Sequence, residues 1–258
     1  RQKALLNMML DCAATLLAKD GVLWLAGENK AGIKSANKQL KSHFGQIRKL
    51  DNARHCSLFE ADTRLNQDLF HPMNYRDQWV LNCNNSGITV ISYPGVFAHG
   101  RLDDGTALLL HALATTELNG DVLDFACGAG IIGACIAARH KDTSVTLLDT
   151  SAMALKACTE TLAANQMEGL VLASDGLSGI NNSFDVVVSN PPIHLGARTD
   201  NHLGMRLLDS VHEHIRPGGR LILVANIHLP YEKWLSTRFK RLSELAANDN
   251  YKVIVATK

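Results

Sequence analysis

The chain has 258 residues, of which 46% are hydrophobic and 20% are charged, and its formal net charge at pH 7 is +1. These values are typical of a soluble globular protein with one large or two smaller domains. No apolar run approaches the ~20 residues that a membrane-spanning helix needs, so we expect no membrane partner.

The first part of the chain is predicted to contain helix 4–18, strand 22–26, helix 30–44 and strand 54–59. Its most distinctive feature is a run of lysines that recur at spacings of four, four and three and so form one stripe on a helix: Lys30, Lys34, Lys38 and Lys41. Cations on one face can follow the phosphates of a nucleic acid. An ordinary solvated helix face is the alternative, and both interpretations stay open at this point.

A polar connector over residues 60–78 leads into a predicted hairpin, strands 79–83 and 88–92, around Asn84-Asn85-Ser86-Gly87. The turn Tyr93-Pro94-Gly95-Val96-Phe97 then marks a junction. We therefore predict two domains, residues 1–92 and 93–258, of which the first has an incomplete strand–helix–strand look.

After a capped helix at 103–115, strands alternate with helices to the end of the chain. The predicted strands are 122–126, 144–149, 170–173, 184–189, 220–225 and 251–256, and the predicted helices between them are 130–139, 151–165, 201–215 and 231–239. This alternation predicts an α/β fold with a mostly parallel, doubly wound sheet of Rossmann-like type. Ligands of such sheets bind at the carboxyl ends of the strands.

The strand at 122–126 runs into a glycine-rich turn, Gly128-x-Gly130-x-x-Gly133, directly before a helix. Taken alone, this pattern is a weak dinucleotide-binding signal. Asp124 sits four residues before the first glycine, where a carboxylate would repel a pyrophosphate and attract a sulfonium or ammonium group. That favours S-adenosylmethionine over NAD, although Asp124 could also simply cap the turn or the helix start.

Two further acids follow successive strands. Asp149 closes the second strand, where an acidic side chain can accept both ribose hydroxyls, and Asp175 lies just past the third, where it can accept from an adenine amine. Asn190-Pro191-Pro192 follows the strand at 184–189. Its prolines lock an extended turn with free carbonyls, which together with the Asn190 amide oxygen can hold both hydrogens of an exocyclic amine.

The six cysteines are scattered with no CxxC pair. This spacing argues against a zinc site or a disulfide framework and suits a reducing cytosol. We therefore expect a cytoplasmic protein without a bound metal.

The glycine turn, Asp149 and Asn190-Pro191-Pro192 together resemble class I S-adenosylmethionine-dependent N-methyltransferases. Four further stretches narrow the resemblance to the bacterial guanine-N2 methyltransferases of 16S ribosomal RNA: residues 27–36, 51–56, 93–97 and 224–231. The resemblance implies two related methyltransferase-like domains. The N-terminal copy would lack the cofactor motif and bind RNA, with its front part absent upstream of Arg1. Separately from the resemblance, we expect a monomer.

The resemblance also implies roles for particular residues. The expected catalytic set around the target guanine is Asn190, Pro191, Pro192, Ile193 and His194. The expected cofactor-binding set is Asp124, Ala126, Cys127, Gly128, Gly130, Asp149, Asp175 and Asn190. The lysine stripe would contact 16S rRNA within the 30S subunit.

Two positions depart from the family pattern. Ala126 stands where the family turn usually has glycine, and Ile193 stands where the loop usually has Phe or Tyr to stack on the base. Another aromatic, Phe97 or Tyr231, could supply the stacking face. Three alternatives remain: a non-catalytic RNA-binding or assembly protein on a decayed methyltransferase fold, a guanine-N2 enzyme for large-subunit rRNA, and an NAD-dependent oxidoreductase.

Overall fold

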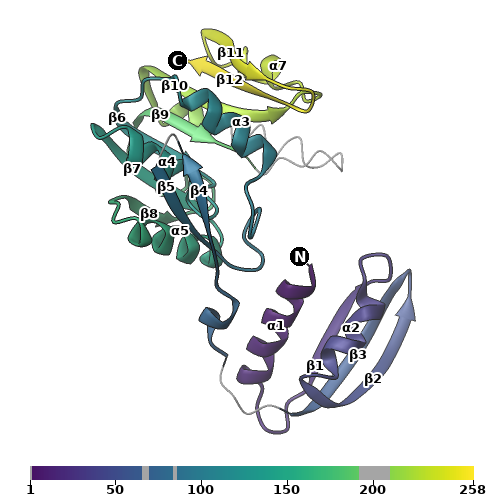
Figure 1. The fold of residues 1–258 in the computed structure, drawn as a ribbon. Coiled ribbons are helices and arrows are strands. Elements are labelled where there is room, and N and C mark those ends of the chain that lie inside the picture. Colours follow the sequence, from purple (N-terminus) through teal and green to yellow (C-terminus); the bar gives the residue numbers. More distant parts are fainter. Residues whose placement is uncertain (1, 66–69, 84–85, 192–209) are drawn as a thin grey trace. The chain divides into compact units, whose positions relative to one another are not determined.

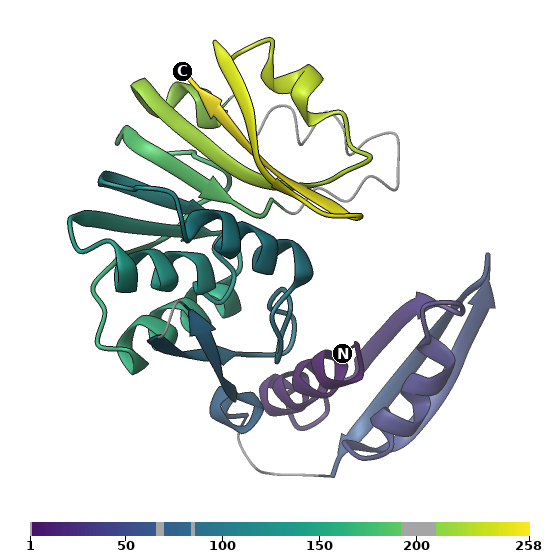
Figure 2. The same cartoon turned by 45° about the horizontal axis from the view of Figure 1, so that its top comes forward.

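The computed structural model describes residues 2–65, 70–83, 86–191 and 210–258. The chain divides into two compact units, Arg1–Arg76 and Asp77–Lys258. Each unit has a β-sheet of its own, as Figure 1 and Figure 2 show. Across the described ranges, none of the helices combines the length and apolar character needed to span a bilayer.

A three-stranded antiparallel sheet ordered β1-β3-β2 forms the centre of the first unit. Its strands are β1 (Leu23–Glu28), β2 (Phe44–Ala53) and β3 (Cys56–Arg64). Helices α1 (Gln2–Leu16) and α2 (Ile33–Leu40) complete the unit, followed by a short 3-10 helix, η1 (Pro72–Tyr75). The buried core draws on both helices and the sheet: Leu10, Ala14, Ile33, Ala36, Leu40, Phe44, Phe59 and Ala61.

The segment after α2 differs from the sequence prediction. The helix predicted over 30–44 ends at Leu40, and Phe44 instead begins β2, which was not predicted. Only the first residue of β2 is buried and most of the others are exposed, so the strand has no alternating apolar pattern to detect. Arg54 and His55 were assigned to a strand but form the β2–β3 turn, with φ values of 49° and 64°.

A seven-stranded mixed sheet ordered β11-β12-β10-β9-β6-β7-β8 forms the second unit. Strands β10, β9, β6, β7 and β8 are parallel, and β12 is antiparallel to β10 and β11. The strands are β6 (Gly120–Phe125), β7 (Thr143–Asp149), β8 (Leu170–Ala173), β9 (Phe184–Ser189), β10 (Ile215–Asn226), β11 (Arg241–Ala247) and β12 (Tyr251–Thr257). The predicted doubly wound α/β fold is confirmed.

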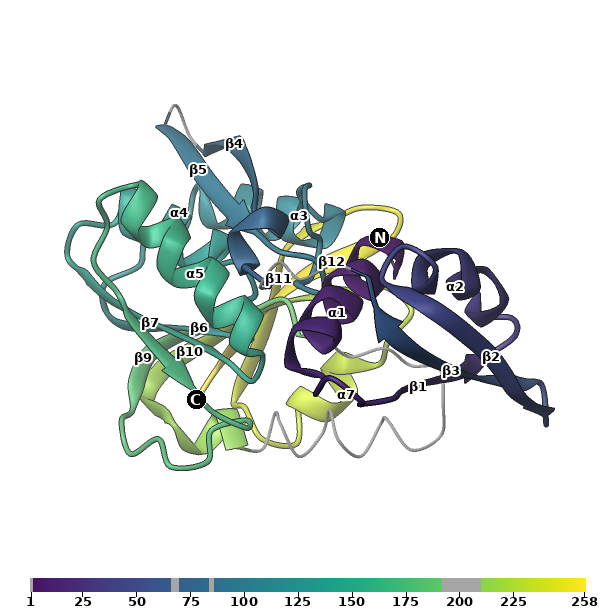
Figure 3. The same cartoon turned by 90° about the horizontal axis from the view of Figure 1, so that it is seen from below.

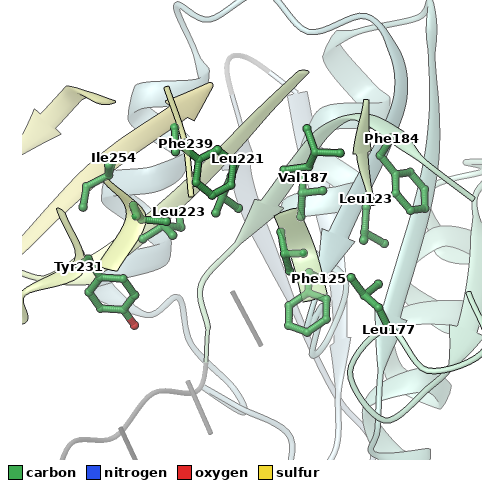
Figure 4. Packing of buried hydrophobic residues seen from close by; sticks show 14 of the residues in the cluster. Leu123, Phe125, Leu177, Phe184, Val187, Leu221, Leu223, Tyr231, Phe239 and Ile254 are labelled. Carbon is green, nitrogen blue, oxygen red and sulfur yellow. The ribbon is translucent and has the colours of Figure 1, made fainter. Parts of the chain in front are cut away.

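Helices cover both faces of this sheet. Figure 3 shows α3 (Asp104–Leu113), α4 (Ile131–Arg139) and α5 (Ala152–Ala164) on one face and α7 (Tyr231–Leu235) on the other. The core beneath α7 joins residues of β6, β9, β10 and β12, including Leu123, Val187, Leu223 and Ile254 (Figure 4). Adjacent strand residues point to opposite faces, so the residues between these core positions face α3, α4 and α5.

The C-terminal part of the second unit differs from the sequence prediction at one edge strand. Strand β11 was not predicted, because it is an edge strand with mostly exposed residues and so lacks a clear apolar pattern. The helix predicted over 201–215 lies largely outside the described residues, and Ile215 already belongs to β10.

The predicted hairpin is present as β4 (Asp77–Cys83) and β5 (Ser86–Ser92). Strand β5 is bonded to helix α5: the Ile91 N–H donates to Thr161 Oγ1 over 3.0 Å, and Asn165 Nδ2 donates to the Thr89 carbonyl over 2.7 Å. These bonds make the hairpin part of the second compact unit, which therefore begins at Asp77, before the domain boundary predicted after residue 92.

Candidate active site

Four neighbouring parallel strands, β9, β6, β7 and β8, end at one edge of the seven-stranded sheet. Asn190 directly follows β9, Asp149 ends β7, and Asp175 comes two residues after β8. The Ser189 hydroxyl donates to the Phe125 carbonyl over 2.8 Å and so joins the ends of β9 and β6. The edge thus brings the predicted catalytic turn and two of the predicted cofactor acids around the glycine turn.

The first two glycines of the turn after β6 have a left-handed backbone. Gly128 and Gly130 have φ values of 55° and 75°, which glycine adopts without steric cost. A Cβ on Gly130 would lie 2.8 Å from Cys158 Sγ, so no side chain fits there. At Gly128 the nearest atom to such a Cβ would be Phe97 Cβ at 3.9 Å, which leaves room for a ligand to approach the backbone. These properties suit a cofactor that lies against the turn.

Cys127 occupies the inside of the same turn. Its N–H donates to the Leu148 carbonyl over 2.9 Å, which fixes the turn to β7. A hydrogen bond that the Cys127 thiol donates to Cys158, together with burial, raises the pKa of this thiol, so it stays neutral. With its side chain buried, Cys127 can contribute to a cofactor site only through its backbone.

Asp149 links the glycine turn to the strand edge. Its Oδ2 accepts a hydrogen bond from the Gly128 N–H over 2.9 Å, and its Oδ1 accepts one from the Ser151 N–H over 2.9 Å. Because each carboxylate oxygen can accept more than one hydrogen bond, capacity remains for two ribose hydroxyls. Asp175 is exposed nearby, and the Ser174 N–H donates to the Asp149 carbonyl over 3.2 Å.

Asp124 lies inside the fold and not on the open side of the turn. Its side chain is 0% exposed, and Oδ2 accepts from the Gly133 N–H in the first turn of α4 over 2.8 Å. Among the described residues, Oδ1 has no partner. Burial raises the pKa of Asp124 to about 7, with the Gly133 bond lowering it only in part. Asp124 therefore lies on the strand face that α4 covers, and its expected contact with the cofactor stays a prediction.

Ala126 has a φ of 58°, although it carries a side chain. The left-handed region costs a non-glycine residue roughly 1–2 kcal/mol. The strain sits at the position where the sequence departs from the glycine of the family pattern.

We expect Ala126→Gly to stabilise the chain. Relief of the backbone strain exceeds the ~0.4–1 kcal/mol that glycine's greater freedom in the unfolded chain costs. The melting temperature should rise by about 2–4 °C, measured by calorimetry. Ala129→Gly, in the same turn at an ordinary φ, is the control and should lower it. A lower melting temperature for Ala126→Gly would show that the strain is absent.

Asn190, in the predicted catalytic turn, forms two hydrogen bonds through its side chain. Its Nδ2 donates to Asp103 Oδ2 over 3.0 Å and to Thr106 Oγ1 over 2.9 Å. Pro191 is described, whereas the predicted catalytic residues Pro192, Ile193 and His194 lie outside the described residues.

Of the two aromatic residues considered for base stacking, Tyr231 is 1% exposed and belongs to the core (Figure 4). This burial raises the pKa of its hydroxyl. Phe97 is 53% exposed and lies beside Gly128. Only Phe97 of this pair can offer a ring face to a ligand.

The four lysines of the predicted stripe are all exposed, on and around α2 of the first unit. None of them forms an ion pair with another residue that the structure describes. Arg48, also in the basic segment, is different because it bonds to Glu60 and Asp62 over 2.8 and 2.9 Å. The lysines are thus open to a polyanion, whereas Arg48 already has carboxylate partners.

Asp103 and Thr106 were not predicted from the sequence as residues of the site. Both belong to the Asp-Asp-Gly-Thr stretch that was interpreted only as a helix cap. The cap itself is present, since Asp103 Oδ2 accepts from the Thr106 N–H over 3.0 Å. Their contact with Asn190 joins residues more than 80 positions apart, and no local pattern carries that information.

The chain matches two family profiles. "Methyltransferase small domain" matches residues 87–255 and "Methyltransferase small domain N-terminal" matches residues 1–79. Relatives named ribosomal RNA small subunit methyltransferase C are 40% identical over 258 residues in Pseudomonas entomophila (100% of this chain, 77% of that protein) and 38% identical over 253 residues in Shewanella loihica (98% and 73%).

A solved structure is similar over nearly the whole chain. It is a T. thermophilus 16S rRNA N2 methyltransferase in complex with AdoMet and guanosine, with a TM-score of 0.88 and 24% identity. The match covers 98% of this chain and 68% of that chain. At this level of identity the likeness supports the fold.

Proposed function

Because the chain belongs to the methyltransferase small domain family, with relatives named for small-subunit rRNA, we propose that it methylates the exocyclic N2 of a guanine in 16S rRNA. The methyl donor is S-adenosylmethionine. The observation that carries the proposal is the orientation of the Asn190 side chain. Its Nδ2 donates to Asp103 and Thr106, so its Oδ1 stays available to accept from an exocyclic amine.

The carboxyl ends of the parallel strands offer a place for each part of the donor. The backbone of Gly128 and Gly130 would lie under it, Asp149 would accept from the ribose hydroxyls, and exposed Asp175 would accept from the adenine amine. Asp124 Oδ2 accepts from the Gly133 N–H and so fixes the start of α4, the helix that follows the turn. When bound, S-adenosylmethionine supplies an electrophilic methyl group on a sulfonium.

The residues after β9 prepare the acceptor. Asn190 Oδ1 and the Pro191 carbonyl would each accept one hydrogen of the guanine amine, so that the nitrogen lone pair points at the methyl group. Transfer would break the sulfur–methyl bond of the donor and leave S-adenosylhomocysteine as a neutral thioether. The nitrogen would take up the methyl group and the positive charge, and would then lose one proton to water. Positioning thus replaces a strong base, and the guanine must be unpaired or flipped out to enter the site. Phe97 supplies a stacking face beside Gly128.

Methyl transfer tests the proposal directly. Donor with a tritiated methyl group is incubated with 30S subunits, naked 16S rRNA and 23S rRNA, and the product nucleosides are separated after digestion. We expect N2-methylguanosine in small-subunit RNA. Label in 23S rRNA alone would point to the large subunit. Binding of RNA without any transfer would support the decayed, non-catalytic alternative, for which the strained Ala126 is the structural argument.

The exposed lysines on and around α2 are proposed to contact RNA phosphates, as part of an RNA-binding role for the first unit. We expect Lys34→Gln with Lys38→Gln to weaken binding of 16S rRNA and to reduce the slope of log affinity against log salt by about 2. Lys141→Gln, an exposed lysine of the second unit, is the control. An unchanged salt slope, measured by fluorescence anisotropy, would leave the stripe as an ordinary solvated face.

A further inference from the structure

The amide of Asn190 is held by the start of helix α3. Asp103 is the N-cap residue of this helix, and Thr106 lies in its first turn. Asp103 Oδ2 and Thr106 Oγ1 accept from Asn190 Nδ2 over 3.0 and 2.9 Å, and Asp103 Oδ2 also accepts from the Thr106 N–H. One oxygen atom therefore caps the helix and binds the side chain of the proposed catalytic turn.

These two acceptors determine which way the amide faces. A carboxylate can only accept hydrogen bonds, so the nitrogen of Asn190 must face Asp103. The nitrogen has two hydrogens, and Thr106 takes the second. The amide oxygen then points away from α3. No residue in the described part of the chain donates to it, so it keeps its full capacity to accept.

The start of α3, which holds the Asn190 amide, is itself closely packed. Thr106 is 5% exposed. A Cβ on Gly105 would lie 3.1 Å from Asp103 Oδ2 and 3.3 Å from the Tyr251 ring, so the cap packs tightly against β12. A side chain bonded to such a support loses less freedom when substrate binds than one in an open loop does.

We propose that Asp103 and Thr106 are positioning residues that orient Asn190 for its substrate and that the Asp103 charge strengthens Asn190 Oδ1 as an acceptor. This inference rests on the proposed function. A donor bonded to a carboxylate is polarised, which increases electron density on the oxygen of the same amide. The stronger acceptor stabilises the transition state of methyl transfer most, because positive charge develops there on the nitrogen that Oδ1 holds.

The test uses a substitution that keeps the cap and removes the contact. Serine is a good N-cap residue, but it is shorter than aspartate and uncharged. In Asp103→Ser we expect kcat to fall by about 10- to 100-fold, with the affinity for S-adenosylhomocysteine and the KM for 30S subunits changed less than about twofold. Asp104→Ser, at the exposed neighbouring acid, is the matched control and should keep wild-type kcat.

Combination with Asn190→Ala shows whether Asp103 acts through that residue. The double variant should be no slower than Asn190→Ala alone, since the two groups form one unit. Thr106→Ser retains the hydroxyl and should be close to wild type, whereas Thr106→Val should lose activity. A wild-type kcat for Asp103→Ser, or losses that multiply in the double variant, would overturn the inference.

A measurement without catalysis separates this inference from the proposed function. The side-chain amide signals of Asn190 in the ¹⁵N spectrum of the full chain should move, and their hydrogens should exchange faster, in Asp103→Ser but not in Asp104→Ser. Unchanged signals in Asp103→Ser would refute the positioning role even if the wild type proved inactive on every RNA. Moved signals together with an inactive wild type would refute only the proposed function.

Discussion

Replacing Asn190 by alanine is expected to lower kcat for methyl transfer to 30S subunits by about 10³-fold, similar to the loss of one preorganised polar group at a reacting centre. The variant loses the acceptor that is proposed to hold the guanine amine. The affinity for S-adenosylhomocysteine should change less than about twofold, because the described contacts of the Asn190 side chain are with α3 and not with the glycine turn. Single-turnover kinetics and calorimetry measure the two quantities separately.

Asn182→Ala is a suitable control, because Asn182 is exposed in the loop before β9. It should retain wild-type kcat. A comparable loss of catalysis and cofactor affinity in Asn190→Ala would contradict the assigned role and place Asn190 among the groups that bind the donor. Full activity would instead shift the acceptor role to the carbonyls of the proline turn.

The glycine turn and Asp149 illustrate what the sequence could predict. A left-handed backbone at Gly128 and Gly130 is a local property, and the position of Asp149 follows from the regular length of a strand–helix–strand unit. Both predictions depend on short-range patterns, which is why the fold of the second unit and the position of these residues at the strand ends were accessible from the sequence alone.

The orientation of Asp124 and the contacts of Asn190 were not accessible in the same way. A strand pattern shows that Asp124 and Phe125 point to opposite faces, but not which face α4 covers. The partners of Asn190 come from a helix cap far away in the chain. Edge strands β2 and β11 were missed for a related reason, since their pairing with β3 and β12 and not an apolar pattern of their own defines them.

The proposed division of labour follows from the same structure. The first unit exposes its lysines, and the second collects the strand-end acids and the Asn190 amide. Changes in the first unit should therefore alter RNA affinity and its salt dependence, whereas changes at the strand edge should alter donor binding or kcat. The largest expected effect on donor binding is at Asp149.

Asp149→Ala should weaken binding of S-adenosylhomocysteine by about 100-fold. Two hydrogen bonds from ribose hydroxyls to a charged acceptor, at roughly 1.5 kcal/mol each, account for this loss. The substitution also removes the acceptors for the Gly128 and Ser151 N–H groups, so the melting temperature of the unliganded chain should fall by a few degrees. Affinity for 16S rRNA should stay within about twofold of wild type, because the proposed phosphate contacts lie in the other unit.

Asp142→Ala provides the control, as an exposed acid just before the opposite end of β7. It should leave the calorimetric affinity unchanged. Asp149→Asn refines the test, because an amide can accept from one of the two N–H groups but presents a donor to the other. It should restore part of the melting temperature while leaving donor affinity well below wild type. Unchanged affinity in Asp149→Ala would remove Asp149 from the donor site, and full recovery in Asp149→Asn would mean that the turn geometry, and not the carboxylate charge, determines binding.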